Sequence, residues 1–211
     1  GLAEIHVLQG KLRQAYGHYQ EALELAQSSD NRAMPMSIGF YVGLGTLYRE
    51  WNDLETAKQH IDTGTKQLSQ ALIGFDAYRL KIVLAQIHMA EGRYEDALGL
   101  LADAKKDFKL GTAPNISSPD SLKARFSLQQ GQFDDALDWI QKADLSTEDA
   151  LRFSNEFDHI TLARVKLAQY RQRPDEQVLA VLLDFLKRLK QSAKEDGRIG
   201  RVLEIIVLQA L

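Results

Sequence analysis

Apolar side chains recur along this chain at intervals of three and four residues, which is the spacing of one face of an α-helix. The pattern is clear in residues 12–23, where the apolar positions are Leu12, Ala15, Tyr16, Tyr19, Ala22 and Leu23. Alternating stretches rich in β-branched residues, which would indicate strands, are absent, and the 211 residues include only four prolines. The sequence therefore predicts an all-α protein.

Four segments of the chain resemble one another: GKLRQAYGHYQEA, NDLETAKQHIDTG, GRYEDALGLLADA and GQFDDALDWIQKA. They begin at Gly10, Asn52, Gly92 and Gly131, so successive segments lie 42, 40 and 39 residues apart. Five residues after each start comes an alanine: Ala15, Ala57, Ala97 and Ala136. A period near 40 residues indicates a stack of repeated helical units.

A second column of small residues precedes each of these segments, and its members are Ala3, Gly45, Ala85, Ala124 and Ala163. Each unit is therefore predicted to be two antiparallel helices that approach most closely where both carry a small residue. Ala57 is expected to face Gly45, because a larger side chain would push the two helices apart.

These columns divide the chain into units of about 1–30, 31–72, 73–112, 113–145 and 146–196, with a partial unit at 197–211. We expect one continuous solenoid over residues 1–211. Both ends stop inside a unit and no initiator Met is present, so we expect a piece of a longer chain. Two helix starts are predicted, one at Ser118 before Pro119 and one at Ser146, which forms a capping box with Asp149.

The phrases LGTLY and GRYEDA resemble the tetratricopeptide repeat (TPR), whose pattern of small and large residues they match. The period here is about six residues longer than the usual ~34. The resemblance implies a TPR-like α-solenoid, a right-handed superhelix whose inner face is lined by the first helix of each pair.

Longer phrases are more specific: GLAEIHVLQGKLRQAYGHYQEALELA, VGLGTLYREWNDLETAKQHI, FDHITLARVKLAQ and GRIGRVLEIIVLQAL. Together they resemble the helical-repeat region of large, ATP-dependent, LuxR-family transcriptional activators of the MalT-like group. That resemblance implies a bacterial regulator with three parts. ATP would bind in a separate N-terminal domain, DNA in a separate C-terminal domain, and this chain would be the signal-sensing part between them.

Composition narrows the function classes. No P-loop motif G-x-x-x-x-G-K-[ST] and no basic recognition helix occur, so neither nucleotide chemistry nor direct DNA contact is expected here. The chain has no cysteine, its apolar runs are too short for a bilayer, and no signal peptide opens it, so a cytoplasmic protein is expected. The net charge is −3, and residues 160–211 carry an excess of positive charge.

No catalytic or metal-binding pattern is found. His6 and His88 share the column of Tyr48, which predicts packing between helices, and Glu156 with His159 forms a single Glu-x-x-His without the second copy that a di-iron bundle needs. We therefore expect neither an enzyme, nor a metal site, nor a cofactor in this chain.

Side chains next to the small-residue column of the first helices are the candidate ligand- or partner-binding residues: Thr46, Arg49, Arg79, Gln86, Arg125 and Arg164. Arg125 and Arg164 hold equivalent positions in successive units. They are predicted either to bind an anionic effector or acidic peptide, or to pair with carboxylates within the solenoid.

Two functions remain open. The first is an effector-sensing and protein-interaction domain, which binds a small molecule or a regulatory protein in the superhelical groove. The alternative is a stand-alone TPR scaffold that binds a peptide of a partner protein. The sequence predicts neither the effector nor the oligomeric state.

Overall fold

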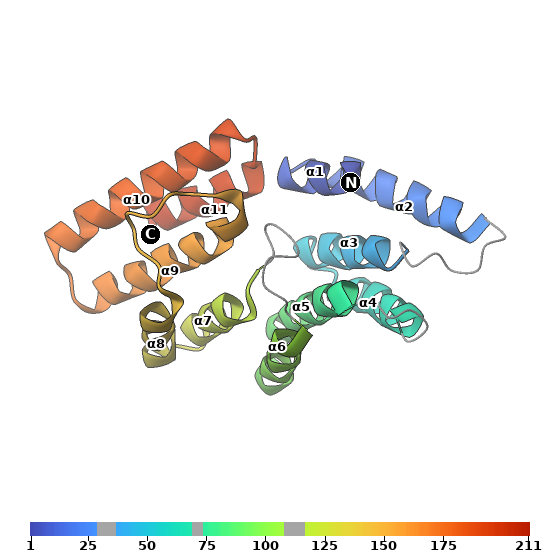
Figure 1. Ribbon diagram of the computed structural model, residues 1–211, viewed down its shortest axis with the longest axis horizontal. Helices are drawn as coiled ribbons and strands as arrows, with labels where there is room; N and C mark the ends of the chain where they lie inside the picture. The colour runs from blue at the N-terminus through green and yellow to red at the C-terminus, as the bar shows by residue number, and fades with distance from the viewer. Residues whose placement is uncertain (29–36, 69–73, 108–116) are drawn as a thin grey trace. The chain divides into compact units, whose positions relative to one another are not determined.

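The computed structural model describes residues 1–28, 37–68, 74–107 and 117–211, which form α-helices and one short 3₁₀ helix, with no strand among them (Figure 1). The prediction of an all-α protein built from helix pairs is confirmed. The chain divides into two compact units, Gly1–Lys109 and Leu110–Leu211, here called the N-terminal and C-terminal units. Whether the repeats continue as one solenoid stays a prediction.

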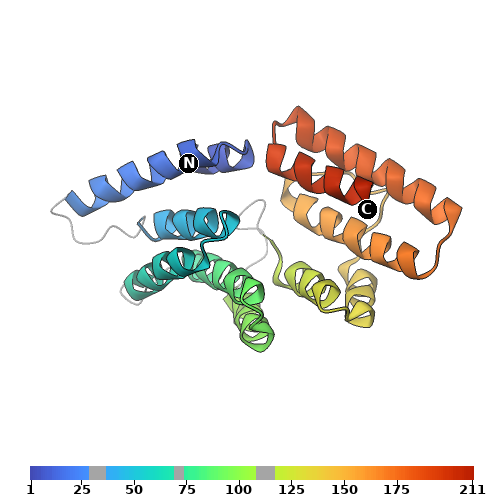
Figure 2. The same cartoon turned by 180° about the vertical axis from the view of Figure 1, so that it is seen from behind.

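The N-terminal unit contains three antiparallel helix pairs. They are α1 (Leu2–Leu8) with α2 (Leu12–Ser28), α3 (Ser37–Glu50) with α4 (Leu54–Leu68), and α5 (Gly74–Ala90) with α6 (Tyr94–Asp107). Successive pairs stack because α2 packs against α3 and α4 packs against α5 (Figure 2). The first helices of the pairs are α1, α3 and α5.

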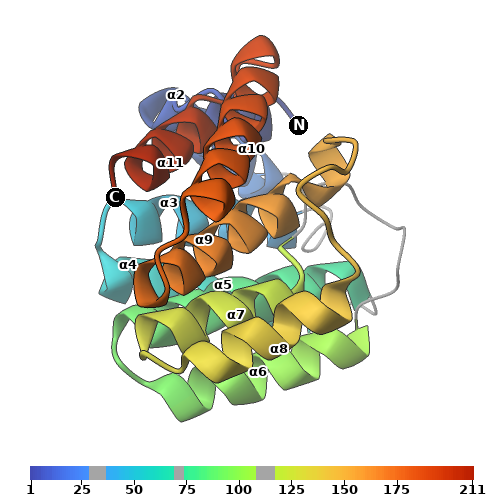
Figure 3. The same cartoon turned by 90° about the vertical axis from the view of Figure 1, so that its left-hand side faces the viewer.

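The C-terminal unit contains two pairs and a further first helix. α7 (Pro119–Gln129) pairs with α8 (Phe133–Ala143), and a 3₁₀ turn (Phe153–Asn155) leads into α9 (Glu156–Gln172), which pairs with α10 (Glu176–Glu195). α11 (Ile199–Ala210) packs mainly on α10 and also touches α9 (Figure 3). None of the described helices of either unit is long and apolar enough to span a bilayer.

The corner column has a conformational reason. Gly10, Asn52, Gly92 and Gly131 all have positive φ, between 61° and 76°. At each corner the next amide donates back to a carbonyl of the preceding helix, as Arg93 N does to His88 O at 2.8 Å. This is the glycine-terminated helix end that residues with a Cβ adopt only at a cost, and Asn is the side chain that tolerates it best.

The close approach predicted within the second pair is present. Ala57 is fully buried, and a Cβ added to Gly45 would lie 3.3 Å from the carbonyl oxygen of Ala57 and 2.6 Å from Cδ1 of Ile61. Two small residues thus bring the backbones of α3 and α4 together, and Ile61 fills the space beside them.

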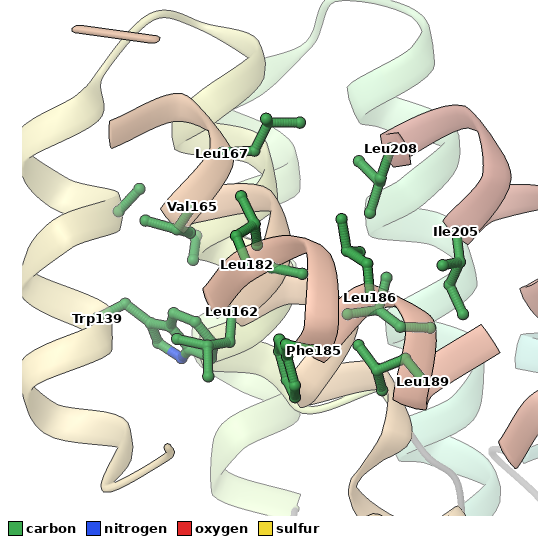
Figure 4. Close-up of a cluster of buried hydrophobic side chains, with 14 of the residues drawn as sticks. Trp139, Leu162, Val165, Leu167, Leu182, Phe185, Leu186, Leu189, Ile205 and Leu208 are labelled. Carbon is green, nitrogen blue, oxygen red and sulfur yellow. The ribbon is translucent and has the colours of Figure 1, made fainter. Parts of the chain in front are cut away.

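The core of the C-terminal unit centres on α10. Its buried residues follow the helical spacing and are Leu182, Phe185, Leu186, Leu189 and Ala193. They pack against Leu162 and Val165 of α9, Trp139 of α8, and Ile205 and Leu208 of α11 (Figure 4). Burial of each such side chain contributes about 1.5–3 kcal/mol, so α10 holds its neighbouring helices in place.

One predicted helix start is correct and the other is wrong. Ser118 caps α7 by accepting from Ser121 N at 3.1 Å. Ser146 N does donate to Asp149 Oδ2 at 2.9 Å, but no α-helix follows until Glu156. The carbonyl groups of Thr147 and Asp149 accept instead from Arg188 on α10, at 2.6 and 2.9 Å, and this holds the segment as a turn.

Replacement of Gly92 by Ala should lower the free energy of unfolding by about 1 kcal/mol, because an L-residue is strained at φ 76°. The matched control is Gly99→Ala in the exposed part of α6, where a Cβ meets no atom within 4 Å. That change should raise stability by about 0.5–1 kcal/mol. Urea unfolding followed by circular dichroism measures both, and equal effects of the two substitutions would contradict this account of the corner.

Candidate functional site

The first helices of the N-terminal unit are joined by an ion pair that spans two repeats. Arg79 on α5 reaches past Gly39 on α3 to the carboxylate of Glu4 on α1, with Nη2 3.2 Å from Oε1. A Cβ added to Gly39 would lie 3.7 Å from Arg79 Nη1, an ordinary van der Waals contact, so the guanidinium group lies close to α3. The side chain of Glu4 is 49% exposed, so water screens this pair strongly.

A hollow of about 240 Å³ lies beside Glu4, between α1, α2 and α3. Its lining residues are Gly1, Leu2, Ala3, Glu4, His18, Tyr19, Ala22, Gly39 and Phe40. Burial raises the pKa of Tyr19 to about 12, and the charge of Glu4 acts in the same direction. The phenol is therefore protonated at neutral pH, and the lining of the hollow includes the carboxylate of Glu4.

None of the four candidate residues of this unit lines the hollow. The Thr46 hydroxyl donates to Val42 O at 2.8 Å, within its own helix. Arg49 pairs with its neighbour Glu50, while its Nε is buried without a hydrogen-bond partner. Gln86 is partly buried on α5. Of the four candidates in this unit, Arg79 is the one whose described ion pair joins two repeats.

The two candidates of the C-terminal unit meet at one carboxylate. Arg125 Nη1 lies 2.7 Å from Glu204 Oε1, and Arg164 Nη2 lies 2.9 Å from the same oxygen. Arg201 Nη1 lies 2.9 Å from Glu204 Oε2. Glu204 on α11 thus joins arginines of α7, α9 and α11, the three first helices of this unit. Pairing within the repeats, the alternative that the sequence left open, holds for both Arg125 and Arg164.

Arg125 is held in place by more than Glu204. Its Nε donates to Thr161 Oγ1 at 2.7 Å, its Nη2 donates to Phe157 O at 3.2 Å, and its guanidinium carbon lies 3.8 Å from the ring centroid of Phe157. Burial lowers the pKa of Arg125 to about 10, and the charge of Glu204 opposes that effect. The guanidinium group is therefore a buried, charged and well-oriented donor at neutral pH.

Glu204 is ionised for an electrostatic reason. Burial raises the pKa of its carboxyl, but the charges of Arg125, Arg201 and Arg164 lower it more, and the resulting pKa is about 2. A carboxylate among three guanidinium groups accepts charge-assisted hydrogen bonds on both oxygens, which is the strongest kind of side-chain hydrogen bond.

Sequence reasoning missed Glu204, Arg201 and the neighbouring pair of Glu156 with Arg198. Both members of that pair are 4% exposed, and Arg198 Nη2 lies 2.9 Å from Glu156 Oε1. The available signal was a single acidic residue inside the apolar run VLEIIVL, since an isolated charge in an apolar stretch needs a partner.

The Glu-x-x-His pattern does not form a metal site. Glu156 pairs with Arg198, whereas His159 Nε2 faces Asp149 Oδ2 at 3.3 Å and its ring lies edge-on to Phe185. Within the described ranges, no three or more His, Cys, Asp or Glu residues are grouped so as to hold a metal ion.

The ionised Glu204 predicts acid sensitivity. Its pKa falls from 4.5 when unperturbed to about 2 in the folded chain. The stability that it contributes is therefore present above pH 4.5 and lost as the pH falls through about 2. The difference in unfolding free energy between wild type and Glu204→Gln should shrink by about 3 kcal/mol between pH 5 and pH 2. Urea titrations at each pH measure this, and parallel pH curves would contradict the assignment.

Comparison with known proteins agrees with the repeat architecture. The family model of the MalT-like TPR region matches residues 1–211. No curated protein matches the chain significantly. Among solved structures, the crystal structure of BtubC (BKLC) from P. vanneervenii superposes with a TM-score of 0.61 at 21% identity, and the match covers 92% of this chain and 78% of that one. On the match over its whole length, the chain belongs to the family of MalT-like TPR regions.

Proposed function

We propose that this chain is the effector-sensing and protein-interaction domain of a bacterial, LuxR-family transcriptional regulator of the MalT-like type. The observation that carries the proposal is the family match over residues 1–211. ATP would bind in a separate N-terminal domain and DNA in a separate C-terminal domain of a cytoplasmic protein. The proposal gives this chain no catalytic role and no cofactor of its own.

The proposed binding surface is the face formed by the first helices, which is the face that helical repeats commonly present to ligands and peptides. In the N-terminal unit it carries Glu4 and Arg79, with the hollow beside them. In the C-terminal unit it carries Arg125, Arg164 and Glu204. These charged groups suit a polar effector or a charged segment of a regulatory protein.

The proposed mechanism is a shift in population. Ion pairs between first helices favour one spacing of the helices, and a ligand that contacts the same side chains favours another. The ligand shifts the equilibrium by its difference in affinity for the two arrangements. In a regulator, that shift would alter the ATPase and DNA-binding domains joined to this one.

A stand-alone TPR scaffold that binds a peptide is the second candidate. What supports it is the TPR-type repeat itself, because helical repeats of this kind present their first-helix face to peptides. The two candidates differ in one measurable consequence. A regulator's effector should change the affinity of the full-length protein for its promoter DNA at least fivefold, whereas a scaffold's ligand should leave that affinity unchanged.

A thermal-shift screen of this chain against sugars, nucleotides, phosphorylated metabolites and amino acids tests for the effector. A small molecule present at a hundred times its Kd should stabilise the fold by ~2.7 kcal/mol and raise the Tm by about 5–10 °C.

If the site lies on the first-helix face of the C-terminal unit, Arg164→Gln should reduce the thermal shift. If it lies on that face of the N-terminal unit, Gln86→Leu should reduce it. The control Lys123→Gln removes an exposed positive charge from α7 and should leave the shift unchanged. Absence of binding by any small molecule and by any protein partner would contradict the proposal.

A further inference from the structure

The arginine cluster of the C-terminal unit, defined as Arg125, Arg164 and Arg201, has more positive charge than its carboxylate neutralises. All three guanidinium groups bond to Glu204. A second carboxylate, that of Glu156, bonds to Arg198 at 2.9 Å and lies 3.7 Å from Arg201 Nε. Arg198 also pairs with Asp196. Four arginines therefore face three carboxylates in the network, and Glu204 is the carboxylate that all three arginines of the cluster share.

Arg125, the least exposed arginine of the cluster, is held in place independently of Glu204. Arg125 keeps its place through Thr161, the carbonyl of Phe157 and the Phe157 ring. The guanidinium groups come from three helices and point at one position. Planar guanidinium donors match the oxygens of carboxylate and phosphate, and phosphate offers more acceptor oxygens and more charge than the single carboxylate present.

The cluster is also reachable from solvent. The side chains of Arg164 and Arg201 are 34% and 24% exposed, while Arg125 and Glu204 are each 15% exposed. A ligand can thus first contact Arg164 and Arg201 at the surface and then exchange with the Glu204 carboxylate. Unlike a ligand, Glu204 belongs to α11, so its departure changes how that helix is held.

α11 makes few other hydrogen bonds or ion pairs with neighbouring helices. Within the described residues, the C-terminal end of the chain makes two side-chain bonds to other helices. Lys190 Nζ donates to Gln209 Oε1 at 2.7 Å, and Arg171 Nη2 donates to Leu211 O at 3.1 Å. Ile205 and Leu208 enter the core, whereas Leu203, Ile206 and Val207 are exposed. At the N-terminal end of the helix, the N-cap residue Arg198 bonds to Glu156 of α9. The helix is therefore held by its contact with α10, by Glu204 and by this buried pair.

We infer that the arginine cluster binds the oxyanion group of a ligand, a phosphate or a carboxylate, in place of Glu204, and that this exchange removes the link from α11 to Arg125 of α7 and Arg164 of α9. The inference rests on the proposed function, because it names the ligand chemistry of the first-helix face. Glu204 acts as an internal competitor that occupies the site until a ligand of higher charge or concentration replaces it.

Binding of inorganic phosphate and of citrate, at constant ionic strength, tests the exchange. Isothermal titration should show that Glu204→Gln binds at least one of the two anions about tenfold more tightly than wild type, because the competing carboxylate is gone. Addition of Arg164→Gln and Arg201→Gln to that variant should abolish binding, whereas Lys123→Gln should not. A preference for phosphate or for citrate identifies which oxyanion the cluster selects.

Hydrogen exchange supplies the second readout. Saturating anion should speed amide exchange in α11 of the wild type and leave the core of α9 unchanged. Circular dichroism checks the fold of each variant. If Glu204→Gln does not fold, Arg164→Gln in the otherwise wild-type chain carries the test, since it should lose the binding and the exchange response.

Equal or weaker anion binding by folded Glu204→Gln, or binding with no change at α11, would overturn the inference. Such a result would leave the proposed function standing, since a neutral effector or a protein partner could still bind the first-helix face. Failure of the proposed function would instead show as the absence of binding by any small molecule or protein.

Discussion

One carboxylate, that of Glu204, bonds to three guanidinium groups on three first helices. Arg125 is largely buried, and a buried charge without a partner costs several kcal/mol, so the packing of α7, α9 and α11 depends on this contact. Arg79 and Glu4 make the corresponding link in the N-terminal unit, also between first helices two pairs apart. That link is more exposed and therefore weaker. Each unit thus contains an arginine and a glutamate that set the spacing of its first helices.

The helix pairs themselves are fixed by different forces. Residues with positive φ end the first helices at the corners, small residues let α3 and α4 approach, and apolar side chains on α10 fill the core of the C-terminal unit. These contacts leave the polar first-helix face free to respond to a ligand. Because its arginines already have partners, a ligand must compete with them, and its measured affinity includes the cost of that competition.

The sequence predicts the parts of this structure that depend on neighbours along the chain. The corner residues from Gly10 to Gly131 and the facing pair of Ala57 and Gly45 repeat with a fixed period, so alignment of the chain with itself finds them. Arg125 and Arg164 are predicted on the first-helix face for the same reason. Their partner is not predicted, because Glu204 is 79 residues from Arg125 along the chain. The helix start predicted at Ser146 fails similarly, since Arg188 on a later helix takes the carbonyl groups that a helix there would use.

The most direct test of the account is a double-mutant cycle between Arg125 and Glu204. The variants are Arg125→Met, Glu204→Gln and the two combined, and the measured quantity is the free energy of urea unfolding at neutral pH. A shared, buried ion pair predicts a coupling energy of about 2 kcal/mol or more, because each single change leaves the other charge poorly compensated. Additive effects, with a coupling energy within about 0.5 kcal/mol of zero, would show that Glu204 does not hold the first helices together.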